Sequence, residues 1–419
     1  MSRRPVSSRL RPRRTVHHPV DLQTADITSQ KERTDMRSDR DFGLTDEQLM
    51  LRDAVRQFVR KEMPDSYARK CDHEKIAPLD VFDKMAALGW LGVAIPEEYG
   101  GSGLGFVELG IIQEELSYGL LELAILFYRA TVHGAHSLLT YGSEAQRKKY
   151  LPLFAAGKFK SSMSLTEPNA GSDAAGVQTR AVRDGDYFVI NGAKVFNSQV
   201  NLADRTVLVT RTDPDVPQHK GISLFFVDPK SPGVTIERLE TLAFRSVGTN
   251  RVTYDNVRVH KDDLLGELNG GWKHLMTNLN KERFSLAAQV TGAAQAALDC
   301  ALQYAKDRVQ FGQPIAKFQV IQHKLADMQI AVHTSRALTY DLARRLDAGV
   351  ECRTEASVAK VFTTEAYFRV ADEGMQILGG YSMTPDFQME RHYRDSRVMR
   401  IGGGSNEVMR NSIAKDLGL

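Results

Sequence analysis

The 419-residue chain has no apolar run near the ~20 residues that an α-helix needs to cross a bilayer. Its first 40 residues also lack the apolar stretch of a secretory signal, so we expect no membrane insertion. Cysteine is scarce. Cys71, Cys300 and Cys352 are far apart and odd in number, which suits a reducing compartment rather than a disulfide framework. We expect a cytoplasmic protein, or a mitochondrial matrix protein in a eukaryote.

Several catalytic motifs are also missing. None of the 11 histidines belongs to a His-Glu-x-x-His motif, and His133 and His136 are more typical of packing or capping than of a metal site. The chain has no Gly-x-Ser-x-Gly elbow. The glycine runs at 100–105 and 402–404 lack the strand-to-helix context of a nicotinamide-binding loop. We therefore predict no bound metal and no nicotinamide cofactor.

The formal net charge of +3 gives no case for a nucleic-acid partner. Much of the excess is local and precedes the first acidic residue, Asp21. The basic residues there are Arg3, Arg4, Arg9, Arg11, Arg13 and Arg14. Prolines interrupt any amphipathic helix in this stretch. A transit peptide and an extension upstream of Met36 are alternatives, and we favour a disordered basic tail over residues 1–40.

Helical patterning begins near residue 44. Thr45 can cap a helix while Gln48 reaches back to it, the spacing of a capping box. After about residue 160 the chain turns to short β-rich runs between turn residues. Asn191-Gly192 lies between two such runs and predicts a hairpin turn. A long alanine-rich helical stretch then begins near Trp272.

This order predicts an α+β multidomain chain. Its parts are an N-terminal α-helical domain at residues 44–160, a central antiparallel β domain at 161–268 and a C-terminal α-helical bundle at 269–419. Strands that are grouped together, rather than alternating with helices, argue against a doubly wound parallel sheet.

The segment from Ser164 to Gly176 carries the strongest motif. It reads Ser-Leu-Thr-Glu-Pro-Asn-Ala-Gly-Ser-Asp-Ala-Ala-Gly, and its small residues let backbone N–H groups approach a phosphate-bearing ligand. Composition alone favours a surface loop, but the order of residues resembles the signature of the acyl-CoA dehydrogenase family. The resemblance runs from about residue 44 to the C-terminus and includes the helical, β, helical order. It implies an FAD between the β domain and the C-terminal helices, completed by a neighbouring subunit of a homotetramer.

Phe196 and Ser198 match two flavin contacts of that family. They stand where many members have the Trp that stacks on the flavin ring and the Thr whose hydroxyl bonds near its N5 atom. Read alone, Phe196 would be a core residue. In the signature itself, Ser172 is implied to lie near the thioester as well as the flavin. The signature residues implied to lie along the flavin are Leu165, Thr166, Gly171 and Ser172.

Two later segments resemble the part of the family's site that holds the other half of FAD. Arg308-Val309-Gln310-Phe311-Gly312 looks like its Arg-x-x-Phe-Gly segment, and the fork of an arginine suits a pyrophosphate. The later Gly379-Gly380 pair lets backbone approach the adenosine diphosphate, although the usual glycine two residues on is Ser382. From these segments and the 400–407 stretch, the residues assigned to FAD are Arg308, Phe311, Gln319, Gln376, Gly379, Gly380, Ser405 and Glu407.

Gly403 stands where many family members carry a glutamate as catalytic base. The family's reaction removes a proton from the carbon α to the thioester and a hydride from the β carbon. Long-chain and isovaleryl-type members place the base on a helix instead, just before an arginine, and Glu282-Arg283 supplies that pair. An arbitrary helical glutamate is usually an exposed surface residue, but glycine at 403 together with glutamate at 282 favours Glu282 as the base. Burial is expected to raise its pKa towards neutrality.

The backbone N–H of Gly403 is implied to bind the thioester oxygen together with a ribityl hydroxyl of FAD. Arg283 and Gly402, with Ser172, are assigned to the substrate. We therefore expect FAD-dependent dehydrogenation of an acyl-CoA to a trans-2-enoyl-CoA, with long or branched chains tolerated and an electron-transfer flavoprotein as acceptor.

Two alternatives stay open at this point. One is a dehydrogenase of carrier-protein-bound acyl thioesters, and the other is a flavin monooxygenase or oxidase on the same fold. A non-enzymatic flavin-binding scaffold is less favoured, because it has no need of a carboxylate at 282.

Overall fold

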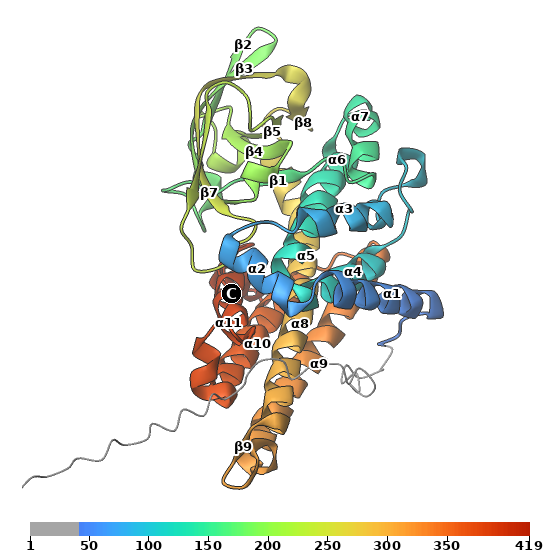
Figure 1. Cartoon of the computed structure of the whole chain (residues 1–419). Coiled ribbons are helices and arrows are strands. Elements are labelled where there is room, and N and C mark those ends of the chain that lie inside the picture. The colour runs from blue at the N-terminus through green and yellow to red at the C-terminus, as the bar shows by residue number, and fades with distance from the viewer. Residues whose placement is uncertain (1–41) are drawn as a thin grey trace, which may run out of the picture. The chain divides into compact units, whose positions relative to one another are not determined.

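α-Helices open the part of the chain that the computed structural model describes, residues 42–419 (Figure 1). The predicted basic tail at 1–40 lies outside the described residues. The predicted capping box is confirmed, since the Gln48 N–H donates to Thr45 Oγ1 at 3.3 Å and the Thr45 N–H to Gln48 Oε1 at 3.0 Å. A π-helix at Arg129–His136 joins α5 to α6. The helices are α1 (Asp46–Glu62), α2 (Asp65–Glu74), α3 (Leu79–Ala87), α4 (Phe106–Gly119), α5 (Leu121–Tyr128), α6 (Ser137–Tyr141) and α7 (Glu144–Ala155).

An eight-stranded sheet follows the helices. Its order is β6-β7-β3-β2-β4-β5-β8, with β1 beside β4. The neighbours are antiparallel except where β4 meets β1 and β2. The strands are β1 (Ser161–Ser164), β2 (Arg180–Asp184), β3 (Tyr187–Ser198), β4 (Arg205–Arg211), β5 (Ile222–Val227), β6 (Val234–Leu239), β7 (Thr249–His260) and β8 (Leu264–Leu265).

The predicted hairpin turn at Asn191-Gly192 is wrong. Both residues lie inside β3, whose register against β7 shifts between Ile190 and Gly192. Gly192 has a φ of 153°, and a Cβ there would lie 2.6 Å from Thr179 Oγ1. The glycine therefore makes a bulge where two segments approach closely. The chain reverses instead at 185–186, between β2 and β3.

The sheet buries side chains on both of its faces, as the two-residue period of a strand requires. On β4, Val207 and Val209 join the core shared with the N-terminal helices, whereas Leu208 joins a cluster built mainly by strands. On β5, Phe226 and Phe225 divide in the same way. One face of the sheet is therefore fixed against the helical part of the chain.

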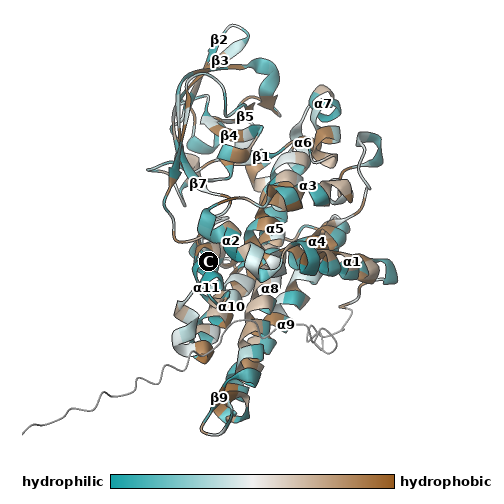
Figure 2. Ribbon diagram, in the orientation of Figure 1, coloured by the Kyte–Doolittle hydropathy of each residue, from teal (hydrophilic) through white to brown (hydrophobic). Residues whose placement is uncertain are grey.

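Long helices complete the described chain. Two close contacts join α8 to α4, because a Cβ at Gly292 would lie 1.9 Å from the Glu114 carbonyl oxygen and one at Gly110 would lie 2.8 Å from Phe284. Each long helix carries both apolar and polar residues (Figure 2), as a helix with one buried face should. The elements are α8 (Gly271–Asp307), β9 (Val309–Gln310), β10 (Gln313–Pro314), α9 (Gln319–Asp347), α10 (Arg353–Leu378), α11 (Met389–Met399) and α12 (Asn406–Asp416).

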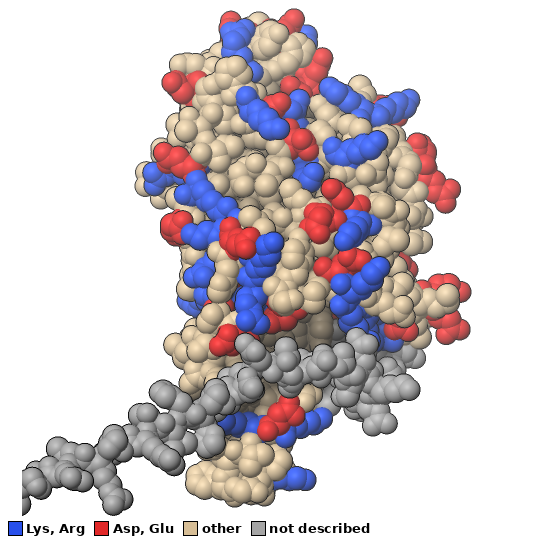
Figure 3. All heavy atoms as spheres, in the orientation of Figure 1, with Lys and Arg blue, Asp and Glu red and all other residues tan. Residues whose placement is uncertain are grey.

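The order of helices, sheet and helices is the predicted fold class. The described residues belong to one compact unit, so the domain boundaries at 160 and 268 stay a prediction. On the face drawn in Figure 3, cationic and anionic groups are interspersed. Among residues 42–419, no helix combines the length and the apolarity needed to cross a membrane.

Candidate active site

Glu282 lies on α8 with only 8 % of its surface exposed. Its Oε1 is 3.1 Å from Nε2 of His133, which comes from the π-helix and is also buried. The same nitrogen is 2.6 Å from the Tyr128 hydroxyl, and the Nδ1 atom of His133 faces the Arg129 guanidinium. The glutamate is therefore a buried carboxylate held by partners, and not an exposed helical residue.

The pKa of Glu282 differs from the sequence expectation. Burial raises it, but the facing His133 and the guanidinium groups of Arg129 and Arg283 outweigh burial and hold the pKa below its usual range. Burial also lowers the pKa of His133, so the imidazole is neutral at pH 7 and contributes a hydrogen bond rather than a charge. The expected rise is wrong for the free protein. The surrounding groups therefore favour the charged form of the carboxyl.

Gly403 lies next to the same face of α8. It has a φ of 67°, and a Cβ built there would lie 2.4 Å from Cδ1 of Leu286. Leu286 is one helical turn after Glu282, and residues four apart are neighbours on a helix surface. The structure thus brings the glycine at 403 and the glutamate at 282, which are 121 residues apart in the chain, to one place.

Lys360 anchors the glycine loop from α10. Its side chain is fully buried, and its ammonium donates to the Gly404 carbonyl at 2.8 Å and to Asn406 Oδ1 at 2.8 Å. Burial lowers the pKa of Lys360 to about 8, so the group is mostly protonated at pH 7. Sequence reasoning missed both Lys360 and Asn406, because nothing in a lysine or asparagine of a helical pattern signals burial.

Replacing Lys360 with methionine should destabilise the fold. The change removes two hydrogen bonds from a buried ammonium, although Asn406 Oδ1 still accepts from Thr364 Oγ1 at 3.2 Å. A hydrogen bond to a charged group contributes about 1.5–3 kcal/mol. We expect a lower Tm in thermal unfolding followed by circular dichroism at matched FAD content. Lys61→Met is the control, because its side chain is 82 % exposed. Equal Tm values for wild type and Lys360→Met would contradict the anchoring role.

The family resemblance assigns Arg283 and Gly402 to the substrate. Arg283 is buried and donates to Ser357 Oγ at 3.3 Å, and its Nε has no hydrogen-bond partner among the described residues. Gly402 is exposed in the loop between α11 and α12. Ser405, assigned to FAD, caps α12 by accepting from the Val408 N–H at 3.3 Å. Glu407 lies in the first turn of that helix, where it is exposed.

The signature segment is tied to β3 by a second buried lysine that sequence reasoning missed. The Lys194 ammonium donates to the Leu165 carbonyl at 2.9 Å and to Glu167 Oε1 at 2.8 Å. The Thr166 carbonyl accepts from the Val195 N–H at 2.9 Å. These bonds fix Leu165 and Thr166 against the strand that leads to Phe196 and Ser198.

Phe196 is not a core residue. It is 64 % exposed near the end of β3, with a φ of 59°. Ser198 is buried, while Gly171 and Ser172 are exposed, and a Cβ at Gly171 would meet no atom within 4 Å. An open backbone and an exposed aromatic ring are what a planar cofactor needs for contact, so these residues fit a flavin.

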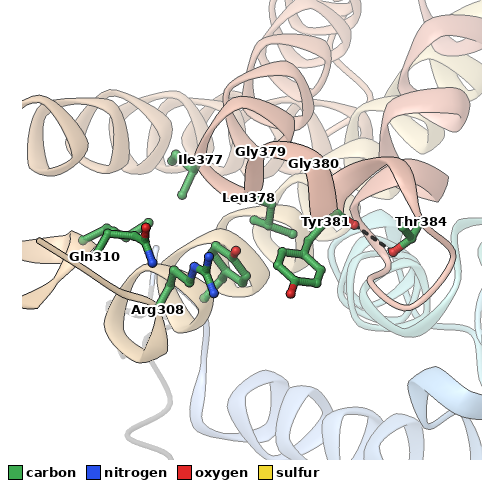
Figure 4. Close-up of a pocket in the computed structure, with 10 residues that line it drawn as sticks. Arg308, Gln310, Ile377, Leu378, Gly379, Gly380, Tyr381 and Thr384 are labelled. Atoms are coloured by element: carbon green, nitrogen blue, oxygen red, sulfur yellow. Dashed lines mark hydrogen bonds between the residues drawn. The ribbon is translucent and has the colours of Figure 1, made fainter. Parts of the chain in front are cut away.

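The two later clusters meet in a pocket of about 490 Å³ (Figure 4). Arg308 lies over the Tyr381 ring at 5.6 Å. Gly379 and Gly380 form another side, and a Cβ on either would meet nothing within 4 Å. A cation beside open backbone suits a nucleotide diphosphate. The lining residues are Tyr304, Arg308, Gln310, Ile315, Ile377, Leu378, Gly379, Gly380, Tyr381 and Thr384.

The predicted FAD residues Phe311, Gln319 and Gln376 do not line this pocket. Phe311 is 95 % exposed at the turn between β9 and β10. Ser382 replaces the family's usual glycine without obstructing the loop, because its side chain is buried and its hydroxyl donates to the Gly379 carbonyl at 2.7 Å.

One cluster has the composition of a metal site. Asp72, His73 and Glu390 bring three potential ligand atoms within 4.8 Å. Arg394 donates to both carboxylates, at 2.8 Å to Asp72 Oδ2 and 2.6 Å to Glu390 Oε2. The group is therefore an ion-pair network around one guanidinium.

Comparison with known protein families identifies the family of this chain. Models of the N-terminal, middle and C-terminal domains of acyl-CoA dehydrogenase match residues 45–158, 162–257 and 269–418. The chain belongs to the acyl-CoA dehydrogenase family. It is an acyl-CoA dehydrogenase, an oxidoreductase that acts on CH–CH groups of an acyl-CoA, and the family binds FAD as predicted.

Relatives support this placement over most of the chain. An acyl-CoA dehydrogenase of Bacillus subtilis is 37 % identical over 89 % of this chain and 98 % of its own length. Subunit CarC of the caffeyl-CoA reductase-Etf complex of Acetobacterium woodii is 35 % identical over 88 % of this chain and 98 % of its own. The structure of butyryl-CoA dehydrogenase from Megasphaera elsdenii is 32 % identical, with a TM-score of 0.87 over 90 % of this chain and all of that one.

The sequence predicts a likeness to the long-chain and isovaleryl branch of the family, but the relatives reported above do not belong specifically to that branch. Other relatives are named short-chain specific and glutaryl-CoA dehydrogenases. The family is thus established, and the branch is not.

Proposed function

We propose that this acyl-CoA dehydrogenase converts an acyl-CoA to a trans-2-enoyl-CoA with Glu282 as the base that removes the α-proton. One observation carries the proposal: Glu282 is a buried carboxylate one helical turn before Leu286, which packs against the glycine that replaces the family's usual glutamate. When FAD is bound, its flavin ring supplies the acceptor for the β-hydride. The family's need for a base is then met from α8 instead of the 402–404 loop.

The role proposed for Gly403 is that of a backbone donor. Its N–H would bind the thioester oxygen and stabilise the negative charge that develops when the α-proton leaves. Arg283 and Ser172 would order the substrate around it. Glycine at 403 also puts no side chain near the α and β carbons of the substrate, and on this ground we propose tolerance of long or branched acyl chains. Leu286 fills the position beside the glycine, since a Cβ at 403 would lie 2.4 Å from its Cδ1.

For FAD, we propose that Arg308, Gly379 and Gly380 hold the diphosphate half, and that Phe196 and Thr166 contact the flavin. As the family resemblance implies, the two halves of each site would come from different subunits of a homotetramer. We also propose domain boundaries near 160 and 268. The cysteines at 71, 300 and 352 are free, which suits a reducing compartment such as the cytoplasm.

An electron-transfer flavoprotein is the proposed electron acceptor, supported by the relative that is a subunit of an Etf complex. Mixing the reduced enzyme with such a flavoprotein should reoxidise it without peroxide. Rapid peroxide formation from oxygen alone would favour an oxidase instead.

The substrate test is anaerobic bleaching of the flavin by a panel of CoA thioesters, from butyryl to palmitoyl and including isovaleryl. We expect long and branched thioesters to reduce the flavin at rates comparable with or above those of short straight chains. Bleaching by short straight chains alone would contradict the role of Gly403 as a source of space. Bleaching by a loaded carrier protein, with no free CoA ester active, would identify the carrier-protein alternative.

A further inference from the structure

The π-helix at Arg129–His136 carries His133, whose imidazole faces the Glu282 carboxylate. A π-helical turn holds more residues than an α-helical one and is often found at functional sites. The segment is fixed from both sides. A Cβ at Gly134 would lie 2.4 Å from the Phe154 ring, and the Ser161 hydroxyl donates to the Arg129 carbonyl at 2.6 Å.

Arg129 decides which nitrogen of His133 carries the proton. The guanidinium has only donors and is hydrogen-bonded to Nδ1 of His133, so Nδ1 must be the unprotonated nitrogen. A neutral imidazole then carries its proton on Nε2. That N–H points to Glu282 Oε1 at 3.1 Å and is shared with the Tyr128 oxygen at 2.6 Å. The opposite tautomer would set a lone pair against a carboxylate.

The groups that face Glu282 come from several elements. Burial raises the pKa of Tyr128 on α5 and raises that of Tyr141 on α6 to about 12, so both phenols are neutral at pH 7. The guanidinium groups of Arg129 and Arg283 are cations that act on the carboxylate. Of these groups in residues 42–419, His133 is the one that lies within hydrogen-bond distance of the Glu282 carboxylate.

We infer that His133 is a positioning residue, which holds the Glu282 carboxylate as a proton acceptor through a hydrogen bond whose direction Arg129 sets. The inference rests on the proposed function of Glu282. A hydrogen bond donated to the charged form favours ionisation. Loss of the donor therefore raises the pKa of Glu282, and the base becomes protonated over a pH range in which the native site is active.

The test is the pH dependence of anaerobic flavin reduction in the FAD-loaded protein, compared for wild type, His133→Leu and His133→Gln. In His133→Leu the acid limb of the pH profile should move up by about 1–2 pH units, because the loss of a hydrogen bond to a charged carboxylate raises its pKa by about that amount. The rate at high pH should recover. His133→Gln retains an N–H donor and should keep its limb near that of wild type. A residue that merely packs would change the rate without moving the limb.

If His133→Leu does not fold with FAD, Arg129→Met tests the same link, because it removes both a cation and the group that fixes the tautomer. Its limb should also move up. Coincident limbs for wild type and whichever of these variants folds would overturn the inference. Glu282→Gln, measured in parallel, separates the two claims. If Glu282→Gln retains full flavin reduction, the proposed base is refuted. If Glu282→Gln loses flavin reduction but the acid limbs of the His133 and Arg129 variants do not move, only the role of His133 is refuted.

Discussion

Glu282→Gln should lower the rate of anaerobic flavin reduction by an acyl-CoA ~10²–10⁴-fold, the usual contribution of a general base. Glutamine keeps the size of the side chain and can still meet His133, so the FAD content and the fold should not change. What it loses is the ability to take the α-proton. The rate of Glu282→Asp should lie between those of wild type and Glu282→Gln, because the aspartate side chain is one methylene shorter and holds its carboxylate farther from the substrate.

Glu267→Gln is the matched control for this experiment. Glu267 is exposed just before α8, so its loss of charge alters the same region without touching the proposed base. We expect its reduction rate to equal that of wild type in a stopped-flow measurement at matched flavin content. An undiminished rate in Glu282→Gln would refute the assignment and return the question to other carboxylates near the substrate.

Arg308→Ala should weaken FAD binding about 10- to 100-fold, because hydrogen bonds from a charged donor contribute about 1.5–3 kcal/mol and each 1.4 kcal/mol is tenfold. Arg308 lines the pocket opposite Gly379 and Gly380 (Figure 4). The measurement is titration of the flavin-free protein with FAD, followed by the change in flavin fluorescence.

Arg369→Ala is the control, since Arg369 is an exposed arginine on α10 and should leave the Kd unchanged. Gly380→Ala provides a second test of the same pocket. Its Cβ would meet no protein atom within 4 Å, so the fold should tolerate it while FAD binds more weakly. A Kd for Arg308→Ala equal to that of wild type would exclude this pocket as the diphosphate site.

Much of the fold could be predicted from the sequence because its signals are local. The Thr45–Gln48 capping box and the grouping of short strands each depend on residues that are neighbours in the chain. The local signal failed at Asn191-Gly192, where the same dipeptide that favours a hairpin turn makes a bulge. Thr179 lies close enough to exclude a Cβ at 192, and no local pattern contains this contact.

The candidate site was only partly predictable for the same reason. Glu282 and Gly403 could be paired because both occupy positions that the family resemblance marks. The sequence predicts only packing or capping for His133. Its contact with Glu282 could not be predicted, because the two residues are 149 apart in the chain. The buried lysines at 194 and 360 carried no signal either, because burial of an ammonium depends on acceptors supplied by other segments.

The most direct test of the relocated base separates proton removal from hydride transfer. A CoA thioester with sulfur in place of the β carbon can lose its α-proton but has no β-hydride to give. Its enolate, next to oxidised flavin, should produce a long-wavelength charge-transfer band in wild type. We predict that Glu282→Gln binds this ligand without forming the band. A band of full intensity in that variant would contradict the claim that Glu282 is the base.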